Sequence, residues 1–374
     1  MIPLARPVLG EREEELLLQA LRSGRLSLGP RVTEFEEAFA ARLGTPYAAA
    51  VSSGTAGLHL AIRSTGVSEG DEVITSPFSF VASANVMLYE RARPVFVDID
   101  PVTLNIAPEA AAAAVTERTS GLLPVHIFGY PADTPGFERL AAQRGLWLVE
   151  DACEALGATH ADATVVGARG NPSVFAFYAN KQLTTGEGGM VVCPDAEAKA
   201  RIDSERNQGR APDMGWLDHD RLGFNYRLSD LACALGIAQL ERLDSILADR
   251  ARVAALYERA LGDVEGVELP MAVGADGARR SWFVYVVKLP HGVDRDGAVE
   301  ALRARGVDSK PYLPSIHLMS FYRERFGHRE GEFPNAEDAS RRCLALPFFP
   351  QLTEGEVGQV AEALADVLAA APAR

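Results

Sequence analysis

The sequence predicts an α/β protein built on a mainly parallel β-sheet that helices cover on both faces. Over the first two thirds of its 374 residues, short apolar runs rich in Val, Ile and Phe alternate with helical stretches. This alternation is typical of strands joined by crossover helices. Glycine-rich or polar segments directly follow three of the apolar runs, at 52–57, 151–157 and 180–189. Because ligands bind at the carboxyl ends of strands in such sheets, these segments are the predicted site.

The predicted elements follow one another regularly along the chain. Strands are expected at 47–51, 71–75, 94–99, 121–128, 145–152, 173–179 and 188–192. Helices are expected at 58–66 and 85–92, between the first three strands. A single helix is expected over about 229–248, and its largely apolar surface predicts a place in the core or at an interface.

A second structural unit is expected after about residue 250. A turn-rich stretch at 269–280 precedes a predicted strand at 281–289 and a helix at 295–306. The last helix is expected to begin at Thr353, because Glu356 three residues later completes a capping box. We therefore expect a large domain over 1–250 and a smaller C-terminal α+β domain over 251–374.

Composition excludes several classes of function. The formal net charge is −14, from 37 basic and 51 acidic residues, which argues against a nucleic-acid or anionic-membrane binder. No apolar run approaches the roughly 20 residues of a membrane span, and the first 15 residues lack a signal-peptide core. The cysteines form no close pair, so we expect reduced core residues, no metal site and a cytoplasmic enzyme. They are Cys153, Cys193, Cys233 and Cys343.

Lys181 stands between an apolar strand and a glycine-rich loop, in FAFYANKQLTTGEGGMVV (175–192). Burial beside aromatic side chains such as Phe175, Phe177 and Tyr178 favours the neutral form of a lysine amine, which is the nucleophilic form. A lysine at a strand end can also extend its ammonium group into solvent. This segment alone leaves both roles open.

Two earlier segments suggest an anion site and a buried carboxylate. SSGTAG (52–57) joins a strand to a helix, so backbone N–H groups and the hydroxyls of Ser53 and Thr55 can hold a phosphate. An ordinary capped turn is the alternative. Asp151 ends an apolar strand, where a carboxylate needs a partner, either a protonated ring nitrogen or the N–H groups of the following turn.

The order of these features is more informative than any one of them. A phosphate turn, an aspartate at a strand end and a loop lysine 30 residues later describe a pyridoxal 5′-phosphate (PLP) site. The turn takes the phosphate, Asp151 takes the pyridine nitrogen, and Lys181 takes the aldehyde.

Over essentially its whole length the chain resembles the DegT/DnrJ/EryC1/StrS family of PLP-dependent sugar aminotransferases. The resemblance implies the fold-type I aspartate aminotransferase fold, with a large PLP-binding domain. The matching segments include SSGTAGLHLAI, DEVITSPFSFVASANV, PVFVDIDPVTLNI, VEDACEALGA, FAFYANKQLTTGEGG and GFNYRLSDLACALGIAQLERLD.

The resemblance also implies a role for individual residues. Lys181 matches the Schiff-base lysine, and Asp151 matches the partner of the pyridine nitrogen. Gly54 and Thr55 match the phosphate-binding turn, and Phe80 matches the aromatic residue that stacks on the ring. Asn225, in GFNYRLSD, matches an asparagine that reaches the phosphate of the neighbouring subunit, which implies a homodimer with shared active sites.

Three positions depart from the family pattern. Ala176 stands where many members have a serine that binds the phosphate, and Ala179 stands in place of a proline. Glu154, three residues after the aspartate, replaces a residue that is often His or Gln. We expect Glu154 to contact the cofactor, where a second carboxylate would favour the protonated ring, or to contact the substrate.

The implied reaction moves an amino group from L-glutamate to a nucleotide-linked keto-sugar, with pyridoxamine 5′-phosphate formed between the two halves. The expected acceptor is a nucleoside diphosphate 4-keto-6-deoxyhexose, and the product is an amino sugar nucleotide for polysaccharide or secondary-metabolite biosynthesis. The segment SKPYLPSIH (309–317) offers Lys310, Tyr312 and His317 as candidate substrate contacts.

Other reactions on the same fold remain open. They are amination of a 3-keto-sugar or an inosose, and PLP-dependent sugar dehydration. Dehydratases of the family have histidine in place of the lysine, so Lys181 favours amino transfer. A PLP-binding regulator is disfavoured because only about 30 residues precede RVTEFEEAFA (31–40) and no basic helix-turn-helix is apparent.

Overall fold

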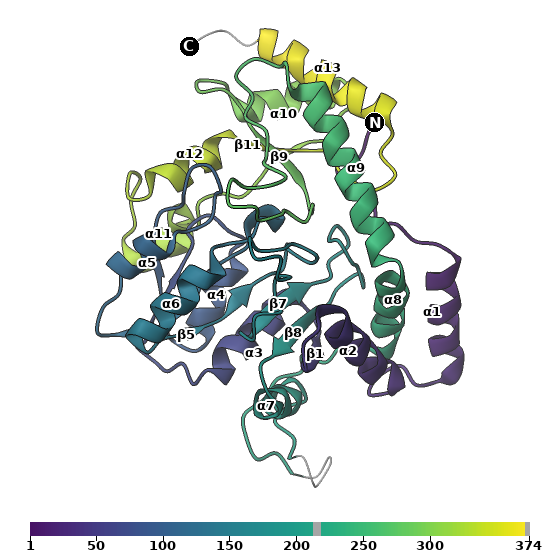
Figure 1. Cartoon of the computed structure of the whole chain (residues 1–374), viewed down its shortest axis with the longest axis vertical. Coiled ribbons are helices and arrows are strands. Elements are labelled where there is room, and N and C mark those ends of the chain that lie inside the picture. Colours follow the sequence, from purple (N-terminus) through teal and green to yellow (C-terminus); the bar gives the residue numbers. More distant parts are fainter. Residues whose placement is uncertain (212–217, 371–374) are drawn as a thin grey trace.

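The computed structural model describes residues 1–211 and 218–370, and a central β-sheet organises most of them (Figure 1). In spatial order its strands are β3 (Arg93–Phe96), β2 (Glu72–Thr75), β4 (Thr119–Leu123), β5 (Trp147–Leu148) with β6 (Glu150–Asp151), β7 (Ser173–Ala176), β8 (Gly189–Cys193) and β1 (Tyr47–Val51). Only β8 runs antiparallel to its neighbours. The predicted α/β class with a mainly parallel sheet is therefore confirmed.

β5 and β6 form one interrupted strand that joins the two halves of the sheet. The N–H groups of Val149 and Asp151 donate to the carbonyls of Leu122 and Pro124, each at 3.0 Å, and a parallel bridge pairs Asp151 with Val125. On the other side, Glu150 and Asp151 pair with β7. Asp151 thus lies at the carboxyl end of a central strand, as the sequence predicts.

Helices cover both faces of the sheet because its strands are apolar on both sides. On one face, Phe175 and Met190 pack in a buried cluster with the phenylalanines of α2 (Pro30–Leu43). On the opposite face, Val174 and Val191 pack against α3 (Gly54–Ser64). The other helices before residue 242 are α1 (Glu11–Ser23), α4 (Ala82–Tyr89), α5 (Pro108–Ala113), α6 (Thr134–Arg144), α7 (Ala196–Arg206), α8 (Asp230–Glu241) and the short η1 (Ile127–Gly129).

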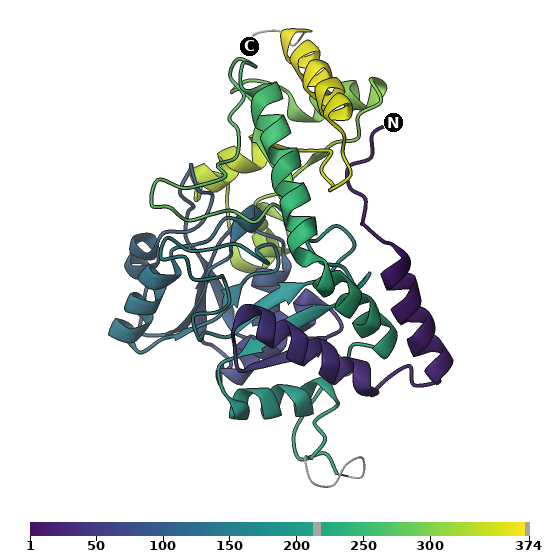
Figure 2. The ribbon, with the colours of Figure 1, turned by 45° about the vertical axis from the view of Figure 1, so that its right-hand side comes forward.

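The helix expected over 229–248 is in fact two helices. Ser229 caps α8, its Oγ accepting a hydrogen bond from Ala232 N–H, but the chain leaves the helical conformation at Arg242 (φ −113°, ψ 13°). A second helix, α9 (Leu243–Leu261), then runs away from the sheet toward the C-terminal part (Figure 2). The prediction of one continuous helix was therefore wrong.

The C-terminal part has its own antiparallel sheet, in the order β10 (Lys310–Pro311), β11 (Cys343–Leu346) and β9 (Tyr285–Lys288). Its other elements are α10 (Arg295–Ala304), η2 (Ile316–Leu318), α11 (Ser320–Phe326), α12 (Pro334–Arg342) and α13 (Glu354–Ala370). The capping box predicted at Thr353 forms, since Thr353 and Glu356 exchange backbone-to-side-chain hydrogen bonds.

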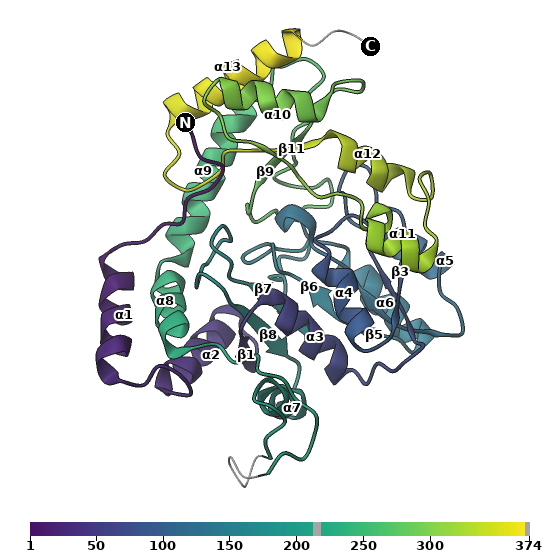
Figure 3. The same ribbon diagram turned by 180° about the vertical axis from the view of Figure 1, so that it is seen from behind.

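α9 and α13 pack side by side around a second apolar core, separate from those of the large sheet. The N-terminal segment joins this part, because Ile2 forms a parallel bridge with Val307 (Figure 3). Residue 250, near which we placed the domain change, lies inside α9, and the division remains a proposal. Among the described residues, no helix combines the length and apolar character needed to cross a bilayer.

Candidate active site

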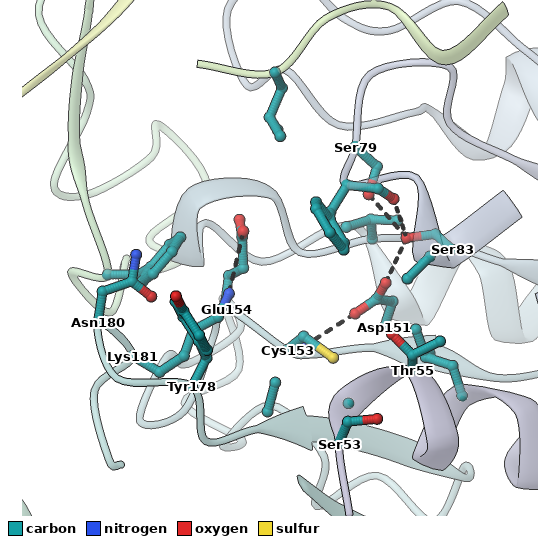
Figure 4. A pocket seen from close by; sticks show the side chains of 18 of the residues that line it. Ser53, Thr55, Ser79, Ser83, Asp151, Cys153, Glu154, Tyr178, Asn180 and Lys181 are labelled. Carbon is teal, nitrogen blue, oxygen red and sulfur yellow. Dashed lines mark hydrogen bonds and ion pairs between the residues drawn. The ribbon is translucent and has the colours of Figure 1, made fainter. Parts of the chain in front are cut away.

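A cavity of about 470 Å³ opens at the carboxyl ends of β6 and β7, beside the start of α3. Its wall includes the three segments that the sequence singled out, residues 79–83, the end of β7 and two segments of the C-terminal part. Figure 4 shows Lys181 and Glu154 on one side of this cavity and Asp151 with Ser83 on the other. The structure therefore brings the predicted lysine, aspartate and glycine turn into one site.

Lys181 points into the cavity from the loop that follows β7. Its backbone N–H donates to the Tyr178 carbonyl at 3.0 Å. Its Nζ lies 3.4 Å from Glu154 Oε1 and 3.8 Å from the centroid of the Phe283 ring. With its side chain only 12% exposed, Lys181 does not extend into solvent, so the geometry favours the chemical role.

Glu154 is held in place by a strained turn. Its Oε2 accepts a hydrogen bond of 2.8 Å from the N–H of Phe128, a buried residue with a left-handed backbone (φ 52°, ψ 28°). The Phe128 carbonyl in turn accepts from Arg280, whose pKa burial lowers to about 10. At the next position, a Cβ on Gly129 would lie 1.8 Å from the Ser281 carbonyl oxygen. Glu154 thus faces Lys181 and is not bonded to Asp151.

Asp151 is a buried carboxylate that lacks a basic side chain as partner among the described residues. Its Oδ2 accepts a hydrogen bond of 2.6 Å from Ser83 Oγ, and its Oδ1 accepts from Cys153 N–H at 3.1 Å. Burial, with the nearby Asp151 charge, raises the pKa of the Cys153 thiol well above its usual value, so this thiol stays protonated. A buried carboxylate held only by neutral donors is suited to a cationic ligand.

The first residues of α3 form the anion-binding side of the cavity. Ser53 Oγ caps the helix by accepting from Ala56 N–H at 3.1 Å, which leaves its hydroxyl proton available to a ligand. A Cβ on Gly54 would lie 2.7 Å from Ala176 Cβ and 3.0 Å from Cys153 Sγ. Only glycine therefore allows this turn to approach β7, with Thr55 beside it in the cavity wall.

The residues present fit PLP. The start of α3 offers backbone N–H groups and hydroxyls to a phosphate. Asp151 offers a charge to a protonated pyridine nitrogen, and Lys181 offers an amine to an aldehyde. Phe80, expected to stack on the ring, lines the cavity and is 62% exposed in this chain.

The C-terminal part closes the cavity with Phe283, Tyr312 and Leu313. Burial, and then the charge of Glu154, raises the pKa of the Tyr312 phenol well above its usual value, so the phenol remains a neutral hydrogen-bond donor. Leu313 has a left-handed backbone (φ 65°) directly before Pro314. Of the three predicted substrate contacts, the structure places only Tyr312 in the cavity wall.

The other two predicted contacts lie elsewhere. Lys310 is exposed on β10 and is not part of the cavity wall. His317 is fully buried, with its Nε2 3.1 Å from Glu337 Oε1, so no substrate in this cavity reaches it. Asn225 is exposed and also lies outside the cavity of its own chain.

Sequence reasoning missed Ser83 and Phe283. Ser83 lies within SPFSFVASANV, but only the packing of α4 against the end of β6 shows that its hydroxyl serves Asp151. Phe283 is more than 100 positions from Lys181, and its apolar strand context gave no sign of a site.

The sequence profile of the DegT/DnrJ/EryC1/StrS aminotransferase family matches residues 7–365. The spore coat polysaccharide biosynthesis protein SpsC of Bacillus subtilis (strain 168) is 36% identical over 380 residues, covering 98% of this chain and 97% of the relative. The structure of DesV from S. venezuelae has 34% identity and a TM-score of 0.89, covering 95% of this chain and 93% of that one. The aminotransferase TlmJ from Streptoalloteichus hindustanus has 34% identity and a TM-score of 0.91, covering 99% of each chain.

Proposed function

The chain belongs to the DegT/DnrJ/EryC1/StrS aminotransferase family, and we propose that it transfers the amino group of L-glutamate to a nucleotide-linked keto-sugar. The family, the fold-type I fold and the PLP-dependent aminotransferase class that the resemblance implied are confirmed. One observation carries the proposal for this site. The Lys181 amine, the Asp151 carboxylate without a basic partner and the start of α3 surround a single cavity.

Besides Lys181, we assign the contacts of one chain with the phosphate and the pyridine nitrogen to four residues. Gly54 and Thr55 hold the phosphate with the backbone N–H groups at the start of α3. The Ser53 hydroxyl supplies a donor that compensates for the serine absent at Ala176. Asp151, kept in position by Ser83 and Cys153, holds the proton on the pyridine nitrogen.

Lys181 has two tasks in this proposal. It anchors the cofactor through its amine, and when released it takes and returns the proton at the reacting carbon of the substrate. PLP, when bound, supplies the electron sink that makes removal of that proton possible. Glu154 Oε1, 3.4 Å from Nζ, keeps the free amine in the cavity between the two half-reactions.

A sugar nucleotide as acceptor is supported by the relatives and by the cavity wall. SpsC is named for spore coat polysaccharide biosynthesis. On the side of the C-terminal part, the neutral Tyr312 phenol can donate to a sugar hydroxyl, and Leu313 offers an apolar surface. We propose a 4-keto-6-deoxyhexose on a nucleoside diphosphate as the acceptor.

We also propose that two copies share their active sites. Asn225, which the resemblance places at the phosphate, is exposed and absent from the cavity of its own chain. Phe80 and Tyr178 line the cavity, yet they are 62% and 52% exposed. A second subunit that brings Asn225 to this side would complete the site.

The experiment separates the two half-reactions. The PLP-loaded protein is converted to its aminated form with L-glutamate, the glutamate is removed, and single keto-sugar nucleotides are added. Return of the PLP absorbance together with an aminated product identifies the acceptor. The same keto-sugars without nucleotide, 3-keto-sugar nucleotides and scyllo-inosose serve as comparisons. Amination of the inosose alone, or loss of water without amination, would refute the proposal.

A further inference from the structure

Arg250, in the middle of α9, is almost completely buried, at 3% exposure, and forms no ion pair with a carboxylate among the described residues. Its guanidinium donates instead to three backbone carbonyls. Nη1 lies 3.0 Å from the Phe283 oxygen, and Nη2 lies 3.2 Å from the Asn180 oxygen and 3.0 Å from the Lys181 oxygen. Burial lowers the pKa of Arg250 to about 10, so the group is still cationic at neutral pH.

The three carbonyls belong to the two segments that hold the lysine side chain. One is the loop that carries Lys181 itself, and the other carries Phe283, whose ring covers Nζ at 3.8 Å. The Arg250 guanidinium therefore fixes the backbone of Lys181 relative to the Phe283 ring, which contacts the other end of the lysine side chain. It also connects the lysine loop of the large sheet to the segment that leads into β9.

We propose that Arg250 is a positioning residue for Lys181. It holds the lysine backbone against the Phe283 segment, so that Nζ stays in the cavity beside Glu154. This inference rests on the proposed role of Lys181 as the amine that binds the cofactor. The planar guanidinium suits the task, because it presents donors in fixed directions to carbonyls on separate segments.

Arg252, two residues along the same helix, is a matched control. It also donates to backbone carbonyls, to Pro350 at 2.7 Å and to Leu352 at 3.5 Å, and it pairs with Asp249 at 3.6 Å. Its side chain is 47% exposed and has no contact with the cavity. Loss of Arg252 thus removes a comparable link of α9 without touching the Lys181 loop.

The first test uses the cofactor-free protein, so that it reports the environment of the Lys181 amine independently of catalysis. The chain contains only four lysines, at 181, 199, 288 and 310. Reductive methylation with ¹³C-formaldehyde labels these lysines and the N-terminal amine, and R250K adds one more labelled lysine. Lys181→Arg assigns the methyl resonance of Lys181 by its absence. We expect R250M and R250K to shift or broaden the Lys181 resonance, while R252M leaves it unchanged.

The second test is kinetic and includes a conservative variant. Because misplacing a catalytic group by about 1 Å can cost about 100-fold in rate, we expect R250M to lower kcat by about tenfold to a hundredfold. KM for L-glutamate should change by less than about threefold, because Arg250 does not touch the substrate. R250K should recover part of kcat, since an ammonium can still donate to these carbonyls, and R252M should match the wild type.

The outcomes distinguish the inference from the proposed function. A wild-type Lys181 resonance and wild-type kcat in R250M, with only a lower Tm, would show a purely structural arginine and overturn the inference. If R250M does not fold, R250Q replaces it, because one neutral amide nitrogen cannot donate to all three carbonyls, and a wild-type resonance and kcat in R250Q then overturn the inference. Turnover by Lys181→Arg would instead refute the proposed role of Lys181, while the resonance in the cofactor-free protein would still report on Arg250.

Discussion

The two oxygens of Glu154 have different partners: Oε1 faces Lys181 Nζ at 3.4 Å, while Oε2 is held by the Phe128 N–H at 2.8 Å. The carboxylate therefore cannot turn away from the lysine without giving up a backbone hydrogen bond. Both side chains of the pair are largely buried, so solvent screens the attraction between them only weakly.

Glu154→Gln should separate the two contacts. The amide oxygen can still accept from Phe128, but the charge opposite Lys181 is lost, so we expect the cofactor-free protein to lose about 1–2 kcal/mol of unfolding free energy. Glu154→Ala also removes the acceptor for the Phe128 N–H, and the total loss should reach about 2–4 kcal/mol. Urea unfolding of the cofactor-free variants measures both. Equal losses in the two variants would show that the hydrogen bond from Phe128 N–H adds no stability.

Lys181→Ala should abolish amino transfer. Because the amine is both the cofactor anchor and the proton carrier, kcat should fall by at least about 10⁴-fold, and the absorbance of the lysine-bound cofactor should disappear. Lys181→Arg is the matched control, since it keeps the positive charge beside Glu154 but has no nucleophilic amine. The proposed role fails if Lys181→Ala still binds PLP covalently and turns over.

Ser53→Ala and Ala176→Ser should change PLP affinity in opposite directions. Ser53 caps α3 with its oxygen and keeps a proton for the phosphate, so its loss should weaken binding by about tenfold, as a hydrogen bond to a charged group would. Ala176→Ser places a hydroxyl in the cavity wall and should tighten binding by a similar factor. Equilibrium titration of the cofactor-free proteins gives both dissociation constants. An unchanged affinity in Ser53→Ala would leave the phosphate contact to the backbone and Thr55.

Tyr312→Phe should affect the sugar half-reaction more than the glutamate half-reaction. The phenol is a neutral donor in the cavity wall, so removing it should raise KM for the sugar nucleotide by about tenfold. Single-turnover rates with each substrate separate the two halves. An equal decrease in the single-turnover rates of both half-reactions would show that Tyr312 contributes to cofactor binding or to folding, and not to binding of the sugar.

His317 should make stability depend on pH without affecting the substrate. Burial lowers its pKa below the usual 6.5, and Nδ1 has no partner among the described residues. Below about pH 6.5 the unfolded chain therefore binds more protons than the folded chain. The unfolding free energy then decreases as the pH is lowered, by at most about 1.4 kcal/mol per pH unit for one group. Burial also lowers the pKa of His59 and His160, which add to this slope.

Denaturant unfolding between pH 7.5 and 5.5 measures the slope. His317→Gln cannot take up the proton, so its slope should be smaller than that of the wild type, and KM for both substrates should not change. A slope equal to the wild type, or a raised KM, would contradict this account of His317.

Local patterns were enough to predict the sheet, whereas the site was proposed from the order of three segments and from the family resemblance. The strands recur close to the predicted positions because apolar runs bounded by polar turns are a local signal. β3 and β4 end earlier than expected, at Phe96 and Leu123, since the chain leaves the sheet there to form the loops at its carboxyl edge. Lys181, Asp151 and Gly54 became candidates because each directly follows a predicted strand, and their order along the chain then favoured a PLP site.

Contacts between distant segments could not be predicted in this way. The Phe283 ring reaches Lys181 only because α9 and β9 bring the C-terminal part over the large sheet. Arg250 looks like one of many helix arginines until its three carbonyl partners are seen. His317 and Tyr312 are five residues apart, yet η2 buries one while the other lines the cavity.

The left-handed turn at Phe128 and Gly129 limits how the enzyme can be redesigned. Phe128 holds an unfavourable backbone conformation, and Gly129 has no room for a side chain against Ser281. This wall should tolerate little change in directed evolution. The Tyr312–Leu313 segment carries no cofactor contact in our assignment, so libraries that seek new acceptor sugars should vary that segment and leave the turn intact.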